Sequence, residues 1–171
     1  DIAVEQPAAS NIADGGNKDF GPAVVGGNTN LTFTIKNTGT ADLTGLGLTI
    51  DGADALQFTV TGNPTAPVSG PNGSTTFTVR FAPNSLGAKI AALHIANNDF
   101  DENPFDITLT GTGVAVPTIT EIANQTINED MNTGDLAFTI GDAETAAASL
   151  ILTKSSSNQT LVPDANIVFA G

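Results

Sequence analysis

The chain has 171 residues, in which 18 acidic side chains outnumber 5 lysines and arginines, for a net charge of −13 at neutral pH. Such a surface repels nucleic acid and anionic lipid, so neither is an expected partner. Cysteine is absent, which excludes disulfides and thiolate chemistry, and no apolar run is long enough for membrane insertion.

Alternating apolar and polar residues predict a series of strands in the first part of the chain, with almost no helix. Turn sequences rich in Asn, Asp and Gly separate them, at 37–40, 51–52, 71–73 and 97–104. About seven short strands of this kind make a two-sheet immunoglobulin-like sandwich, expected over residues 1–113. The inward positions are Ile2 and Val4; Leu31, Phe33 and Ile35; Leu46, Leu48 and Ile50; Phe58 and Val60; Phe77, Val79 and Phe81; Ala91, Leu93 and Ile95; and Phe105, Ile107 and Leu109.

A short linker, residues 114–117, ends at a proline that restricts the backbone. A second strand series then begins, and residues 118–171 are expected to form a second, partial sandwich, about three strands short of closure. The fold class is therefore all-β, with two tandem immunoglobulin-like β-sandwiches of which the second is incomplete. Its predicted strands run from Ile119 to Ile127, through Leu136, Phe138 and Ile140, through Leu150 and Leu152, and through Ile167 and Phe169.

Three ordered blocks of the first part carry a family resemblance: "FTIKNTGTADL", "STTFTVRFAP" and "IANNDFDENPFDITLTGTG". They resemble the hydin-like (ASH) immunoglobulin-type domain that bacterial sequences carry under the name choice-of-anchor D. This resemblance implies a module of a large secreted or surface-anchored protein, and it brings no catalytic residues with it.

The second part, "PTITEIANQTINEDMNTGDLAFTIGDAETAAASLILTKSSSNQTLVP", resembles the opening of cadherin-like or Ig-like repeats in bacterial surface and adhesion proteins. In such repeats a further hairpin usually follows. The resemblance implies an extracellular or cell-surface location.

Acidic residues gather in the turn sequence at 97–104, where Asp99, Asp101 and Glu102 offer oxygen ligands of the type that calcium prefers. The segment is not an EF-hand, because Glu102 stands where the loop needs glycine and Thr108 where a bidentate glutamate would bind. The alternative is an acidic hairpin tip shaped by Asx turns.

A second acidic set consists of Glu129, Asp130, Asp142 and Glu144. Calcium at this set would stiffen the joint between neighbouring modules, because the cation would remove carboxylate repulsion. A solvated acidic edge is the alternative. No other cofactor is expected.

The sequence does not indicate an enzyme. His94 is the only histidine and has no cysteine or second histidine to complete a metal site or a nucleophile pair, and we expect it at the surface. The carboxyl pair Asp99 and Asp101 lacks an aromatic-lined cleft around it. Tyr and Trp are absent, which argues against a sugar-binding face.

The apolar residues of the second strand series face the place of the missing sheet: Leu136, Phe138, Ile140, Leu152, Ile167 and Phe169. Leaving four of them in water forfeits about 6–12 kcal/mol. That rivals the whole stability of a domain, about 5–15 kcal/mol. A covering surface is therefore expected, supplied either by a neighbouring copy or by the rest of a longer chain.

These observations predict a non-catalytic extracellular module of a bacterial surface or secreted protein. The sharper hypothesis is a filament subunit, in which copies assemble head-to-tail by strand or edge complementation. The alternative is an adhesive or ligand-binding module of a larger multidomain surface protein, stiffened by calcium.

Overall fold

The structure, a computed structural model, describes residues 1–128 and 131–170. It consists of β-strands and loops with three single-turn 3-10 helices, so the all-β prediction is confirmed. The chain divides into two compact units, Asp1–Val116 and Pro117–Gly171, and the division falls within the predicted linker. No helix of the described residues combines the length and the apolar character that crossing a bilayer requires.

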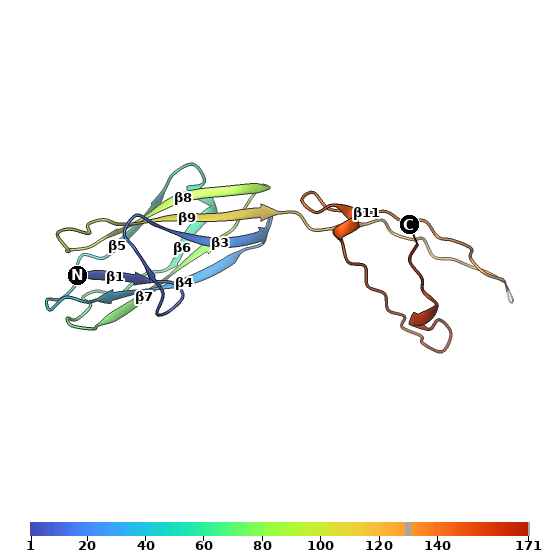
Figure 1. The fold of residues 1–171 in the computed structure, drawn as a ribbon, viewed down its shortest axis with the longest axis horizontal. Coiled ribbons are helices and arrows are strands. Elements are labelled where there is room, and N and C mark those ends of the chain that lie inside the picture. The colour runs from blue at the N-terminus through green and yellow to red at the C-terminus, as the bar shows by residue number, and fades with distance from the viewer. Residues whose placement is uncertain (129–130, 171) are drawn as a thin grey trace. The chain divides into compact units, whose positions relative to one another are not determined.

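Unit 1 contains two sheets that pack face to face (Figure 1). The first sheet has the order β2-β1-β4-β7-β6 and the second has the order β3-β9-β8-β5. All neighbouring strands are antiparallel except β3 and β9, which run parallel. The strands are β1 (Ile2–Glu5), β2 (Asn11–Ile12), β3 (Gly16–Val24), β4 (Thr29–Asn37), β5 (Gly47–Asp51), β6 (Phe58–Gly62), β7 (Ser74–Phe81), β8 (Gly87–Ala96) and β9 (Phe105–Val114), with the 3-10 helix η1 (Ala55–Gln57) between β5 and β6.

The predicted strands of unit 1 all form, and their inward positions build one core between the sheets. Most of these side chains are buried, while Leu31, Leu46, Leu48, Ile50 and Val60 pack against the core at its margin. The core is therefore complete within unit 1.

Strand β3 was not predicted, because its sequence "GNKDFGPAV" lacks a clean alternation. Its pairing with β9 shifts register between Asp19 and Pro22, where Gly21 adopts a φ of +71°. A bulge of this kind accommodates glycine and proline on an edge strand, since the outer backbone of an edge has no ladder to lose. Only Phe20 and Ala23 of this strand reach the core.

Phenylalanine rings fill the centre of the core. Phe58 stacks on Phe81 with ring centroids 4.8 Å apart, and Phe33 stacks on Phe77 at 4.9 Å. The ring of Phe81 lies against Gly111 of β9, where an added Cβ would come within 2.6 Å of it. Glycine at that position therefore makes room for the ring.

Unit 2 has little regular structure. β10 (Thr118–Ile119) pairs antiparallel with β11 (Ile140–Gly141), and the 3-10 helices η2 (Ala147–Ser149) and η3 (Asp164–Asn166) follow. No described residue of this unit is buried. That unit 2 is a partial sandwich stays a prediction.

Two predicted strands of unit 2 do not form. The segments 150–152 and 167–169 lie outside any ladder, and the predicted strand at 119–127 pairs only at its start. A strand exists by pairing its backbone groups with a neighbour, and neither segment is paired with a neighbouring strand among the described residues. An alternating sequence is therefore not sufficient by itself to form a strand in these segments.

Candidate functional site

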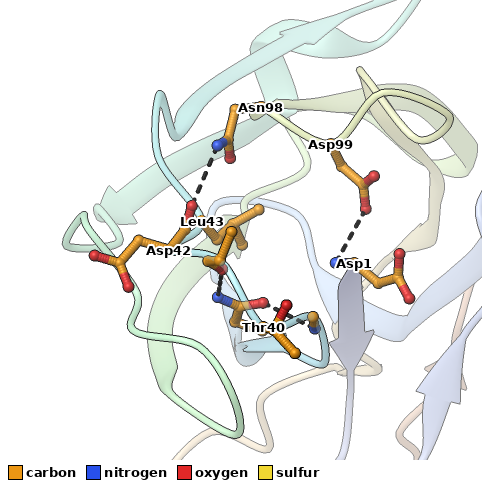
Figure 2. A pocket seen from close by; sticks show the side chains of 9 residues that line it. Asp1, Thr40, Asp42, Leu43, Asn98 and Asp99 are labelled. Carbon is orange, nitrogen blue, oxygen red and sulfur yellow. Dashed lines mark hydrogen bonds and ion pairs between the residues drawn. The ribbon is translucent and has the colours of Figure 1, made fainter.

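A polar hollow of about 290 Å³ opens at the end of unit 1 that carries the N-terminus (Figure 2). Two segments form its walls: the loop from β4 to β5 and the start of the loop from β8 to β9. The hollow is lined by Asp1, Asn37, Gly39, Thr40, Ala41, Asp42, Leu43, Asn98 and Asp99.

Asparagine side chains hold the backbone around this hollow. Asn37 is buried, and its Nδ2 donates to the carbonyl oxygens of Ala41 and Val68 at 2.7 and 2.8 Å. Asn98 joins the two walls, because its Oδ1 accepts from the N–H of Thr44 at 2.7 Å and its Nδ2 donates to the carbonyl of Asp42 at 3.2 Å. The walls are thus tied by side chains that the sequence analysis had treated as turn residues.

The structure brings together two of the three carboxylates predicted at 97–104. Oxygens of Asp99 and Asp101 lie with one of Asp1 in a group spanning at most 4.8 Å. Burial works against ionisation of Asp99, yet the hydrogen bond from the N–H of Ile2, the nearby amino group and a hydrogen bond with Asp101 hold its pKa below the ordinary value.

Glu102, the third predicted ligand, does not join this group. Its pKa is raised, first by burial and then by the charges of Asp99 and Asp101. Glu102 therefore keeps its proton to a higher pH than an ordinary glutamate does. Asp99 and Asp101, with Asp1, are the oxygen donors that remain for the predicted calcium.

Of the second predicted calcium set, only Asp142 and Glu144 lie within the described residues. Asp142 closes a local turn, since its Oδ1 accepts from the N–H groups of Glu144 and Thr145 at 3.1 and 2.7 Å. Those hydrogen bonds lower the pKa of Asp142 against the effect of burial. Glu129 and Asp130 lie outside the described residues, so their part in a site stays a prediction.

The six residues of the predicted assembly interface are all exposed or half-exposed. Phe138 and Phe169 contact each other edge to face, with ring centroids 5.9 Å apart. Leu136 is 37% exposed and Phe169 is 40% exposed.

Ile140 and Leu152, which belong to the same predicted interface, line an apolar groove of about 380 Å³ in unit 2. The remaining lining residues come from the linker end, β10 and the segment after η2: Pro117, Thr118, Ile119, Leu150, Ile151 and Thr153. Four of the six residues thus contribute to two apolar features, the groove and the Phe138–Phe169 pair.

His94 is more constrained than its expected place at the surface suggested. It lies half-buried on β8 between two carboxylates, with Nδ1 2.7 Å from Asp106 of β9 and Nε2 3.2 Å from Asp51 of β5. Both ring nitrogens carry protons only in the imidazolium, which alone can donate to both carboxylates. The hydrogen bonds with Asp106 and Asp51 accordingly raise the pKa of His94. The antiparallel register sets His94 opposite Asp106. The sequence alone does not reveal this register, so the contact was not predicted.

This bridge predicts a pH-dependent stability of unit 1. Because folding raises the pKa of His94, the stabilisation is complete below the unfolded pKa of about 6.5 and is lost as pH rises through the folded pKa. The exposed carboxylates limit the effect to about 0.2–1 kcal/mol. Denaturant unfolding between pH 6 and pH 9 measures it, and His94→Gln is expected to remove the step. A step that persists unchanged in His94→Gln would contradict the assignment.

The two packed sheets of unit 1 and their strand order define an immunoglobulin-like β-sandwich domain. The chain matches the model of the HYDIN/CFA65/VesB-like, Ig-like domain over residues 15–112. That match spans more than half of the 171 residues, and the chain belongs to this family. The predicted hydin-like resemblance is therefore confirmed. The match does not reach unit 2, whose resemblance to cadherin-like repeats stays a prediction.

Several solved structures resemble the chain in fold. A Porphyromonas gingivalis W83 protein of unknown function is 19% identical with a TM-score of 0.49, and the match covers 65% of this chain and 46% of that one. The ASH/PapD-like domain 7 of human CEP192 is 13% identical, with a TM-score of 0.43 and coverage of 67% and 86%. The secreted serine protease VesC from Vibrio cholerae is 16% identical, with a TM-score of 0.43 and coverage of 57% and 22%.

This chain thus spans less than half of the Porphyromonas gingivalis protein. The three likenesses concern the fold alone. No curated protein matches the chain.

Proposed function

We propose that this chain is a non-catalytic structural module of a secreted or surface protein, and that its copies assemble head-to-tail through unit 2. The observation that carries the proposal is the exposure of unit 2. Every described apolar side chain in it stays at least partly in water, whereas unit 1 has a complete core.

Exposure of the apolar side chains of unit 2 is costly in free energy. Each large apolar side chain left in water forfeits about 1.5–3 kcal/mol relative to burial. Ile119 is 63% exposed and Ile151 is 91% exposed, so the exposed set is larger than the six predicted residues. A second copy that covers part of this set would stabilise unit 2 as it forms the contact.

The ladder of unit 2 is short. β10 and β11 share only the pairs Thr118 with Gly141 and Ile119 with Ile140. The extended segments 150–152 and 167–169 have the alternation of strands without a ladder. Such segments are suited to accept a strand from another chain, as in other cases of β-strand addition.

Two features support a non-catalytic role outside the cell. The only histidine has both ring nitrogens turned to carboxylates, which leaves neither nitrogen free to act as a general base. The resemblance of unit 1 to choice-of-anchor D modules, and of unit 2 to surface repeats, supports an extracellular or cell-surface location.

The acidic group at the polar hollow favours a second candidate function, that of a calcium-stiffened ligand-binding module. Titration of the full chain with Ca²⁺ in a calorimeter tests it. Heat that disappears in Asp99→Asn with Asp101→Asn would support this candidate. Absence of heat at millimolar Ca²⁺ would contradict it.

Light scattering of the full chain over a dilution series tests the proposed assembly. We expect the average mass to rise with concentration well above 17.2 kDa and to fall again on dilution. A mass that stays at the monomer value at the highest attainable concentration would contradict the proposal.

A further inference from the structure

Among the described strands, β3 and β9 are the only neighbours that run parallel. β3 is the first long strand of unit 1, with nine residues, and β9 is the last strand of this unit. The chain leaves β9 at the end of unit 1 that lies opposite the N-terminus (Figure 1). Because β3 is parallel to β9, it begins at the other end. A pull along the chain therefore draws the two strands past each other lengthwise.

The direction of a pull decides how many hydrogen bonds carry the load. When two paired strands are pulled apart from the same end, their hydrogen bonds break one after another. When two parallel strands are pulled lengthwise from opposite ends, their evenly spaced hydrogen bonds share the load and fail together. Forced unfolding is governed by the unfolding rate, so a geometry that loads many bonds at once needs a higher force.

Backbone pairing between β3 and β9 is long. Seven residue pairs register the two strands. Hydrogen bonds extend the pairing at both ends, since the N–H of Gly15 donates to the carbonyl of Asp106 at 2.8 Å and the N–H of Val25 donates to the carbonyl of Val114 at 2.9 Å. The pairing therefore runs almost from one end of β9 to the other.

Side chains support the pair at the bulge, where the ladder is interrupted. The Oδ1 of Asp19 accepts from the N–H of Gly21 at 3.1 Å and from the Oγ1 of Thr110, on β9, at 3.2 Å. Phe20 and Ala23 anchor β3 in the core. On its other side β9 is held by nine residue pairs with β8. Neither strand can slide lengthwise without breaking these contacts.

Building on the proposed role as a structural module, we propose that unit 1 bears tension along the chain and that the β3–β9 pair is its mechanical clamp. A module of a secreted or surface protein is pulled whenever the molecules attached to its two sides are drawn apart. The clamp keeps the length of unit 1 fixed under such a pull, because the core stays closed until the pair fails. The clamp acts within a single copy, so it rests on the structural role and not on assembly through unit 2.

Pulling single molecules of the full chain in an optical trap through two introduced cysteines tests the clamp. Cysteine is absent from the chain, so the introduced pair provides the only thiol attachment points. The first variant, Ala13→Cys with Val116→Cys, loads β3 and β9 from opposite ends. The second, Ala13→Cys with Phe100→Cys, loads them from the same end, because both handles precede these strands. All three side chains are exposed and accessible to a handle.

We expect the first variant to unfold at a force about twofold or more above that of the second. The two variants share one handle and are expected to have the same unfolding midpoint in denaturant, so the direction of the pull accounts for the difference. A first variant that unfolds at the same force as the second, or at a lower one, would overturn the clamp and leave assembly through unit 2 standing. Light scattering that shows only monomer would overturn the assembly alone.

Discussion

Replacing Phe81 by alanine is expected to lower the free energy of unfolding of unit 1 by about 3–5 kcal/mol. Its ring is fully buried, stacks on Phe58 at 4.8 Å and lies 6.0 Å from the ring of Phe20. Gly111, which has no side chain to move inward, cannot refill the space that the ring leaves. Denaturant unfolding of the full chain, followed by a signal from unit 1, measures the loss.

Phe100→Ala is the matched control for this core substitution. Both variants remove a phenylalanine ring, but Phe100 is fully exposed, so its removal is expected to change stability by no more than about 0.5 kcal/mol. Equal effects of the two substitutions would show that the core is not centred on Phe81.

The double variant Ile167→Asp with Phe169→Asp is expected to abolish assembly while unit 1 keeps its wild-type unfolding midpoint. Phe169 contacts Phe138 in the exposed apolar surface of unit 2, and two carboxylates placed there would have to be desolvated when another copy covers them. A deletion of residues 160–171 is expected to act in the same way. Light scattering reports the loss of assembly and denaturant unfolding reports unit 1.

The control adds the same two charges elsewhere in unit 2, as Leu161→Asp with Val168→Asp. These side chains are 78% and 79% exposed, and Val168 alternates with the two interface residues. We expect the control to assemble like the wild type. Loss of assembly in the control as well would mean that added charge, rather than the surface around Phe169, prevents association.

The strands of unit 1 were predictable from sequence wherever burial is one-sided. Phe33 and Ile35 alternate with polar residues in β4, because one face of that strand meets the core and the other meets water. β3 escaped prediction for the opposite reason: an edge strand with a bulge tolerates Gly21 and Pro22, and these residues hide the pattern.

The sites depend on register and on loop geometry, which a sequence pattern does not contain. The bridge of His94 to Asp106 exists because β8 and β9 pair in one particular register. The polar hollow depends on Asn37 and Asn98, whose hydrogen bonds reach carbonyls and N–H groups far along the chain. In unit 2 the apolar positions were predictable, but their pairing was not, since a strand forms only when a partner is present.

If another copy covers the apolar surface of unit 2, amide hydrogen exchange in this unit depends on protein concentration. We expect peptides containing residues 136–140 and 167–169 to exchange fast in dilute solution and to slow down as concentration rises, in the wild type but not in Ile167→Asp with Phe169→Asp. Exchange that is independent of concentration, whether uniformly slow or uniformly fast, would contradict it.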